Sequence, residues 1–221
     1  DTILKHFNSI TAENEMKFEN LHPKEDEYTF SISDEMVSFA EQNDIGVRGH
    51  TLVWHNQTSD WLFKKDGKDI DSSTLDQRMK SHIDTVLDRY KGKRYAWDVV
   101  NEVVLDEKEP FLRQSKWLDI LGEEFIEKAF IYAHEADPNA QLFYNDYNEY
   151  APIKSEKIYQ LVKGLKEKEI PVHGIGMQAH WNIVDPQLDD IKRAIEKYAS
   201  LDVRIHVTEM DVSMYDFEDR R

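Results

Sequence analysis

The sequence contains no cysteine, little glycine or proline, and no long apolar run. Without cysteine no disulfide can form, so the folded state of these 221 residues must rest on its hydrophobic core. The 8 glycines and 6 prolines are scattered, which excludes a collagen-like or linker-rich chain. No apolar segment approaches the roughly 18 residues that a membrane-spanning helix needs, so we expect no membrane partner.

Positive charge is also scarce. The chain has 28 Lys and Arg against 44 Asp and Glu, a formal net charge of -16. Such a surface repels phosphate backbones and anionic lipid, so we expect no nucleic-acid partner, whereas a neutral polysaccharide meets no such barrier. The lack of cysteine and of a signal-type apolar segment favours a cytoplasmic location. Secretion stays open, because the chain starts at Asp1 without a methionine and its N-terminus looks incomplete.

Short strand-like runs alternate with amphipathic helical patterns along the chain. The runs, rich in β-branched and aromatic residues, are Ser9–Ala12, Gly46–Trp54, Tyr95–Val100, Gln141–Tyr144, Gly174–Met177 and Val203–Thr208. Apolar residues at helical spacing predict helices over 34–42, 75–90, 125–133, 158–165 and 188–198. This alternation predicts one α/β domain over residues 1–221 with a parallel sheet, either doubly wound or closed into a barrel.

Polar residues gather where these runs end. The ends carry Glu13 and Asn14, Trp54 and His55, Asn101 and Glu102, Asn145 to Tyr147, Gln178 and His180, and Glu209 and Asp211. A β/α barrel builds its active site at the C-terminal ends of its strands, whereas a doubly wound sheet concentrates polar groups at one switch point. The distribution favours a barrel enzyme. Strand alternation also predicts that Gln178 and His180 share one face.

Two glutamates at strand ends, Glu102 and Glu209, suit the cleavage of a glycosidic bond. One carboxyl group protonates the leaving oxygen, and the other attacks the anomeric carbon or activates water. A separation of about 5–5.5 Å gives retention and about 6.5–9.5 Å gives inversion. From these residues alone both outcomes stay open.

A metal site is the alternative for the histidines. His50, His55 and His180 could combine with Glu209 or Asp211 as ligands. The chain lacks the spacings H-x-H and H-E-x-x-H, and it has no glycine-rich nucleotide-binding motif. We therefore expect neither a metal nor a cofactor.

Six segments, in order along the chain, resemble the motifs of glycoside hydrolase family 10, the endo-β-1,4-xylanases. Two of them, Trp97–Glu102 and Thr208–Asp211, resemble its catalytic signatures. The other four are Thr11–Lys17, Arg48–His55, Tyr144–Asn148 and Gly174–His180. The resemblance implies a (β/α)8 barrel that hydrolyses xylan or xylo-oligosaccharides with retention, by double displacement through a covalent glycosyl-enzyme.

The resemblance also implies roles for individual residues. Glu102 is implied as the acid/base and Glu209 as the nucleophile. The implied substrate-binding residues are Glu13, Asn14, Lys17, His50, Trp54, Gln57, Asn101, Tyr147, Gln178 and His180. Within that set, Tyr147 is expected on the leaving-group side, and Gln178 and His180 are expected to hold the nucleophile and the sugar in place.

The chain matches strands two to seven of the eight-stranded barrel, so the first and last strands are expected to be absent from it. Two other functions therefore stay open: an inactive fragment that binds xylan, and a related retaining β-1,4-glucanase. A finer resemblance, at 91–93, 115–117 and 219–221, is to the smaller intracellular members of the family. The oligomeric state is left open.

Overall fold

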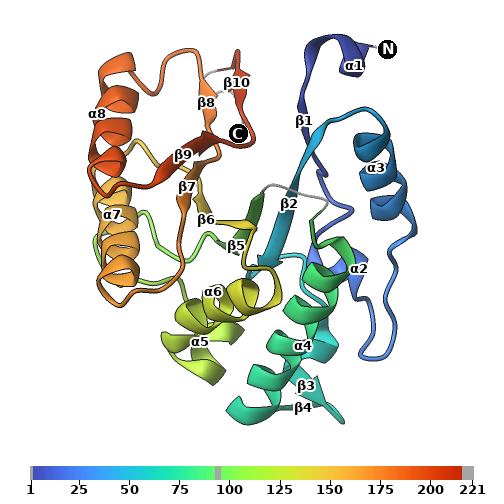
Figure 1. The fold of residues 1–221 in the computed structure, drawn as a ribbon. Coiled ribbons are helices and arrows are strands. Elements are labelled where there is room, and N and C mark those ends of the chain that lie inside the picture. The colour runs from blue at the N-terminus through green and yellow to red at the C-terminus, as the bar shows by residue number, and fades with distance from the viewer. Residues whose placement is uncertain (1, 93–95, 216–221) are drawn as a thin grey trace. The chain divides into compact units, whose positions relative to one another are not determined.

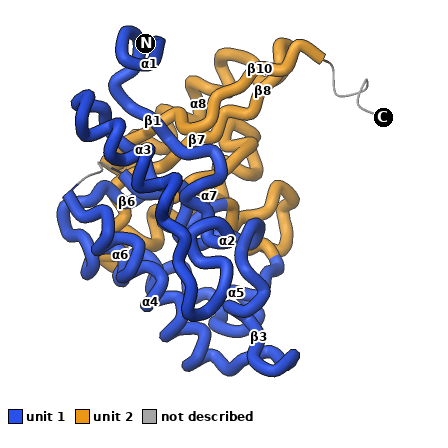
Figure 2. The backbone as a smooth tube through the Cα atoms, turned by 90° about the vertical axis from the view of Figure 1, so that its right-hand side faces the viewer, with its two compact units in different colours: residues 1–101, 114–142 blue, residues 102–113, 143–221 orange. Residues whose placement is uncertain are grey.

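The computed structural model describes residues 2–92 and 96–215 and resolves the chain into two compact units. Unit 1 comprises residues 1–101 and 114–142, and unit 2 comprises residues 102–113 and 143–221 (Figure 2). The expectation of a single domain over 1–221 stays a prediction. Within the described residues, no helix is both long and apolar enough to cross a bilayer.

Unit 1 is built on parallel strands covered by helices. Its elements are α1 (Thr2–His6), β1 (Ser9–Thr11), α2 (Phe18–Leu21), α3 (Ser31–Gln42), β2 (Gly46–Val53), a 3₁₀ turn (Asp60–Phe63), the hairpin β3 (Lys64–Lys65) and β4 (Lys68–Asp69), α4 (Ser72–Tyr90), β5 (Ala96–Asn101), α5 (Lys116–Leu121) and α6 (Glu124–Ala136). Strands β1 and β5 both pair in parallel with β2. Helices α4 and α6 pack side by side, and α6 also contacts β5 (Figure 1).

The core of unit 1 follows from the helical spacing seen in the sequence. Leu75, Met79, Ile83 and Val86 of α4 are buried, as is Phe130 of α6. Each such side chain contributes about 1.5–3 kcal/mol when it leaves water. Helix α4 begins after Asp71, whose side chain accepts a hydrogen bond from the Thr74 amide at 2.8 Å and so caps the helix.

Unit 2 shows the same alternation of strands and helices as unit 1. Its elements are β6 (Gln141–Asp146, of which 143–146 lie in this unit), α7 (Pro152–Glu167), β7 (Gly174–Met177), β8 (His180–Asn182), α8 (Leu188–Ala199), β9 (Arg204–Val207) and β10 (Asp211–Ser213). Strands β6 and β9 pair in parallel with the two edges of β7. Helices α7 and α8 lie side by side (Figure 1), and Pro152 opens α7 at a position where proline costs no hydrogen bond.

The α/β class and each predicted strand are confirmed, with no described end shifted by more than two residues. The predicted strand at Tyr95 starts outside the described residues, and β5 is described from Ala96. The shared-face argument for Gln178 and His180 is wrong in its premise. Ala179 has a φ of +61° and separates β7 from β8, so no strand runs through both residues.

Close strand packing in unit 1 requires the glycine at position 49. Gly49 of β2 lies opposite Trp97 of β5, and a β-carbon there would lie 2.1 Å from the indole ring. We expect Gly49→Ala to lower the free energy of unfolding by about 1–3 kcal/mol, the typical result of overpacking a core. Urea unfolding measures it, with Gly164→Ala as the control, because a β-carbon at Gly164 would have no atom within 4 Å beyond its chain neighbours and the backbone of its own helix. Equal stability of the two variants would contradict the packing argument.

Candidate active site

Both predicted catalytic carboxylates lie in unit 2, at the ends of their strands. Glu102 follows β5, and Glu209 comes two residues after the last residue of β9. The Gln178 side-chain amide donates to Glu102 Oε1 at 3.0 Å. The Asn145 side-chain amide donates to Glu209 Oε1 at 2.8 Å. A carboxylate only accepts hydrogen bonds, so the amide nitrogens must face the two glutamates.

The same two amide residues also bond to the backbone of the opposite glutamate. The Glu102 amide donates to the Asn145 carbonyl at 3.0 Å, and the Glu209 amide donates to the Gln178 carbonyl at 3.2 Å. Asn145 therefore binds the side chain of Glu209 and the main chain of Glu102, while Gln178 does the reverse. We call this arrangement the crossed amide pair. It fixes each carboxylate relative to the backbone that carries the other.

Gly176 has no side chain, and the Asn145 side chain occupies the space that one would fill. Asn145 of β6 lies opposite Gly176 of β7, and a β-carbon at Gly176 would lie 2.1 Å from Asn145 Oδ1. That oxygen is in turn 2.8 Å from the Thr208 hydroxyl, which can donate to it. The glycine and the threonine together define the orientation of the Asn145 amide toward Glu209.

His180 links Glu209 to Asp211. Strand β10 pairs with β8 in parallel, with Asp211 opposite His180. The imidazole has Nδ1 2.6 Å from Asp211 Oδ2 and Nε2 3.3 Å from Glu209 Oε2. Partial burial lowers the pKa of His180, but the two carboxylates outweigh this effect and raise the pKa above its usual value. A protonated imidazole can donate to both carboxylates at once.

Glu102 itself has an unusual backbone conformation, with a φ of +58°. A non-glycine residue in this left-handed region costs about 1–2 kcal/mol, and such strain concentrates at functional sites. Its carbonyl accepts a hydrogen bond from Arg113 Nε at 3.0 Å. A terminal nitrogen of the same guanidinium donates to the Tyr147 hydroxyl at 2.6 Å, so Arg113 joins the predicted leaving-group contact to the backbone of the predicted acid.

Asp146, which stands between Asn145 and Tyr147 in the sequence, forms a buried ion pair with Lys154. Lys154 Nζ is 3.0 Å from Asp146 Oδ1, and neither side chain is exposed. Burial raises the pKa of Asp146 to about 7, because the apolar surroundings disfavour its charged form more than Lys154 and the Tyr144 hydroxyl favour it.

The raised pKa of Asp146 gives stability a defined pH dependence. An unfolded aspartate has a pKa of about 3.9, so folding takes up a proton between pH about 4 and 7, and stability falls as pH rises through that window. We expect Asp146→Asn to remove this contribution and to flatten the curve of unfolding free energy against pH. Urea unfolding at half-unit steps from pH 4 to 8 measures the slope. An unchanged slope in the variant would contradict the assignment to Asp146.

Unit 1 holds a second cluster, formed by predicted substrate-binding residues. Lys17 Nζ donates to Asn14 Oδ1 at 3.0 Å and to Gln57 Oε1 at 2.8 Å, and it lies 5.2 Å from the centre of the Trp54 ring. Glu13 is exposed, and within residues 2–92 and 96–215 its side chain forms no hydrogen bond or ion pair with this cluster. The cluster presents amide, ammonium and indole groups together, a combination suited to binding a neutral sugar.

His50 is held by a buried charge pair. Its Nδ1 is 3.0 Å from Asp98 Oδ2, and Arg48 binds the same carboxylate through Nε at 3.2 Å and through a terminal nitrogen. Burial raises the pKa of Asp98, but Arg48 and His50 outweigh it and keep that pKa below its usual value. The carboxylate therefore keeps the proton of a neutral His50 on Nδ1. Asn101, the last residue of β5, is buried.

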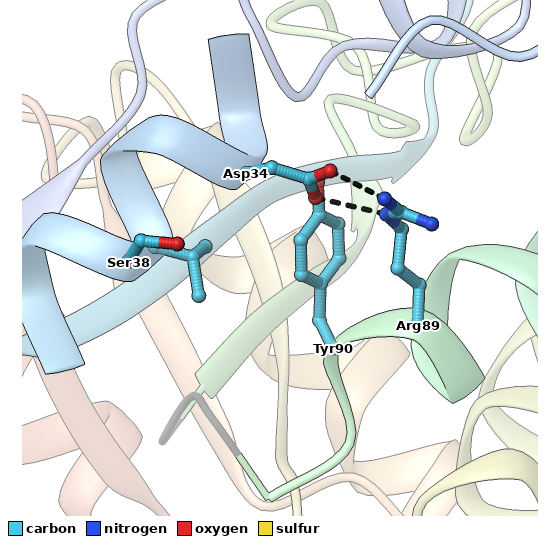
Figure 3. Close-up of a pocket in the computed structure, with 5 residues that line it drawn as sticks. Asp34, Ser38, Arg89 and Tyr90 are labelled. Carbon is cyan, nitrogen blue, oxygen red and sulfur yellow. Dashed lines mark hydrogen bonds and ion pairs between the residues drawn. The ribbon is translucent and has the colours of Figure 1, made fainter. Parts of the chain in front are cut away.

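The described residues contain no group of three or more His, Asp or Glu side chains arranged to hold a metal ion. A pocket of about 430 Å³ opens elsewhere in unit 1, lined by Asp34, Val37, Ser38, Arg89 and Tyr90 (Figure 3). The ion pair of Asp34 with Arg89 crosses it from α3 to α4. It includes none of the predicted site residues.

Sequence reasoning placed Asn145 and Asp146 at a strand end and left open whether they orient a neighbouring group or cap the loop, and it missed Arg113 and Lys154. One signal was available for Lys154. It stands at helical spacing from Ile158, Val162 and Leu165, so a lysine occupies a position on the buried face of α7. A lysine there needs a partner, which Asp146 supplies.

Comparison with known proteins gives the family. Residues 1–221 match the sequence profile of glycosyl hydrolase family 10. The chain is 58% identical over 220 residues to endo-1,4-beta-xylanase B of Paenibacillus barcinonensis and 57% identical to an endo-1,4-beta-xylanase of Geobacillus stearothermophilus. In each case the match covers 99% of the chain and 66% of the relative.

Solved structures that resemble this chain are consistent with the same family. The crystal structure of xylanase XynB from Paenibacillus barcinonensis with a conduramine derivative has a TM-score of 0.98, and the match covers 100% of this chain and 67% of that one. A mutant structure in complex with xylotriose, 49% identical, has a TM-score of 0.96 over 99% of this chain and 67% of its own. The (β/α)8 fold of these structures confirms the predicted fold class. The chain belongs to glycosyl hydrolase family 10, and it spans about two thirds of the length of the curated relatives that it matches.

Proposed function

We propose that this chain carries the catalytic carboxylates of a retaining endo-1,4-β-xylanase that acts on xylan or xylo-oligosaccharides. The observation that carries the proposal is the crossed amide pair, which holds Glu102 and Glu209 in one hydrogen-bonded set. Relatives named endo-1,4-beta-xylanase, 58% and 57% identical to the chain, support the choice of substrate.

Membership of glycosyl hydrolase family 10, whose enzymes retain the anomeric configuration, supports double displacement. Glu209 attacks the anomeric carbon and forms a glycosyl-enzyme, while Glu102 gives its proton to the leaving oxygen. Glu102 then takes a proton from water, and the water oxygen replaces Glu209 at the anomeric carbon, which restores the original configuration. Asn145 and His180 each bind one oxygen of Glu209 and so orient its carboxylate for attack.

The test is hydrolysis of an aryl β-xylobioside by two forms of the protein. One is the 221-residue chain. The other is a chimera in which the part of the Paenibacillus barcinonensis enzyme outside the matched segment is joined to it. Release of the aryl group that disappears with Glu209→Gln, and a first sugar product in the β configuration by NMR, are the expected results. A chimera that folds but releases no aryl group would overturn the proposal, whereas activity of the chimera alone would favour the inactive-fragment alternative for the isolated chain.

A glucanase is the second candidate, since one relative, 50% identical over 95% of this chain, is named exoglucanase XynX of Acetivibrio thermocellus. Aryl β-cellobioside differs from the xylobioside by a hydroxymethyl group on each ring. We expect the ratio of kcat/KM values to favour the xylobioside, and a ratio in the opposite direction would make the glucanase the better assignment.

We propose a cytoplasmic site of action, supported by 48% identity to a solved structure described as an intracellular xylanase from Thermoanaerobacterium saccharolyticum. Of the segments behind the finer resemblance, residue 93 and residues 219–221 lie outside the described residues. Fractionation of the producing cells, with activity followed in medium and lysate, tests the location.

A further inference from the structure

A closed ring of buried polar groups begins and ends on Val104, two residues after Glu102. The Val104 amide donates to the Tyr144 hydroxyl at 3.3 Å, and that hydroxyl donates to Asp146 Oδ2. Asp146 Oδ1 is 3.0 Å from Lys154 Nζ, which donates to the Val104 carbonyl at 2.6 Å. We call Val104, Tyr144, Asp146 and Lys154 the Val104 ring.

Every member of the Val104 ring is buried, with 0% of its surface exposed. Lys154 Nζ also lies 4.3 Å from the centre of the Tyr147 ring and 3.7 Å from Asp106 Oδ1. A buried ion pair contributes little net stability compared with apolar side chains of similar volume, because both ions lose their water. Its better-supported role is to select one arrangement of the groups around it.

The Val104 ring binds the main chain of the segment that follows Glu102. Both the Val103 and Val104 amides donate to the Tyr144 hydroxyl, at 3.2 and 3.3 Å. The Val103 carbonyl accepts from the Arg113 amide at 2.7 Å. The amide and the carbonyl of Glu102 have the partners described above, and the Val104 carbonyl is bound by Lys154. Every main-chain amide and carbonyl from residue 102 to residue 104 therefore has a partner. Such complete bonding keeps Glu102 at its φ of +58°.

We propose that Tyr144, Asp146 and Lys154 are positioning residues for proton donation by Glu102. They act through the main chain of residues 103 and 104 and hold the Glu102 carboxyl group at the point where it meets the leaving oxygen. The proposal rests on the proposed function, since it assigns to Glu102 the role of acid. It predicts that damage to the ring slows only those reactions that need the proton.

The decisive variant is Tyr144→Phe, which removes one hydroxyl group and keeps the ring packing. The matched control is Tyr198→Phe, in the same unit, where a fully buried tyrosine donates to the main-chain carbonyl of Glu149 at 2.6 Å. Two aryl β-xylobiosides are compared in whichever form, chain or chimera, is active. A phenyl leaving group needs protonation, and a 2,4-dinitrophenyl leaving group departs without it.

We expect Tyr144→Phe to reduce kcat/KM about 10-fold to 100-fold for the phenyl substrate, the range that a misplacement near 1 Å produces. The dinitrophenyl substrate should stay within about twofold, since it bypasses the general acid. Tyr198→Phe should leave the ratio of the two values unchanged. An equal loss on both substrates in Tyr144→Phe would reduce the ring to a structural role, and no loss on either would overturn the proposal.

Hydrogen exchange separates this proposal from the proposed function. Tyr144→Phe should accelerate exchange of the Val103 and Val104 amides, and Tyr198→Phe should not. If the wild type cleaves neither xyloside, the proposed function fails on its own, and the exchange result still tests the anchoring. Unchanged protection of both amides in Tyr144→Phe would overturn the anchoring whatever the activity. The double variant Tyr144→Phe with Lys154→Met should lose less kcat/KM on the phenyl substrate than the two single losses combined, because both residues belong to one ring.

Discussion

Glu209→Gln is expected to reduce kcat for aryl β-xylobioside hydrolysis at least about 10⁴-fold, because the reaction then has no nucleophile; losses of this size accompany removal of the nucleophile in well-studied hydrolases. The amide can still accept from Asn145, so the fold should be unaffected. Stopped assays with a sensitive fluorescent leaving group measure the residual rate. The matched control is Glu167→Gln, an exposed carboxylate of α7 that pairs with Lys163 at 3.7 Å and should leave activity unchanged.

Glu102→Ala should behave differently from Glu209→Gln, and the difference assigns the two roles. Loss of the general acid should cost about 10²–10⁴-fold in kcat/KM on a phenyl leaving group and little on a dinitrophenyl one. Added azide should restore turnover of Glu102→Ala and give a β-xylobiosyl azide, since the small anion replaces the base-activated water. If azide instead restored Glu209→Gln with a β product, the two assignments would have to be exchanged.

Gly176→Ala is expected to lose activity although position 176 bears no functional group. Its β-carbon would lie 2.1 Å from Asn145 Oδ1, so Asn145 must move away from Glu209 or β7 must shift. Overpacking costs about 1–3 kcal/mol of stability, and the displaced amide should lower kcat about 10²-fold. Kinetics and urea unfolding of the same preparation separate these effects.

The control for Gly176→Ala is Gly164→Ala on α7, where the added methyl group meets no atom within 4 Å beyond its chain neighbours and the backbone of its own helix. Replacing a helical glycine with alanine should stabilise the chain by about 0.5–1 kcal/mol and leave kcat unchanged. A Gly176→Ala variant with the kcat of the wild type would show that Asn145 can move without consequence for Glu209.

The sequence predicts the elements and the strand ends of this chain well, because both depend on local periodicity. Buried runs such as Gly174–Met177 are read directly from β-branched and apolar residues, and Glu102 and Glu209 stand out as charges that follow them. Helix α5 was not predicted, since its 6 residues are too few to establish a helical period.

Contacts between strands are less accessible to sequence reasoning. Asn145 binds Glu209 across 64 positions, and Lys154 binds the Val104 carbonyl across 50. No local pattern encodes such partners, because they depend on register and on which face each strand presents. The left-handed conformations of Glu102 and Ala179 were also not predicted, since glycine is the usual residue there and neither position has one.

The crossed amide pair has a consequence for how this enzyme family can change by mutation. Asn145 and Gln178 each serve one glutamate with a side chain and the other with a backbone carbonyl, and a substitution removes only the side-chain contact. A change at Asn145 therefore alters the contact with the Glu209 carboxylate and keeps the main-chain bond to Glu102, and a change at Gln178 does the reverse. The surroundings of the two glutamates can thus diverge one at a time by mutation, while their backbones stay joined.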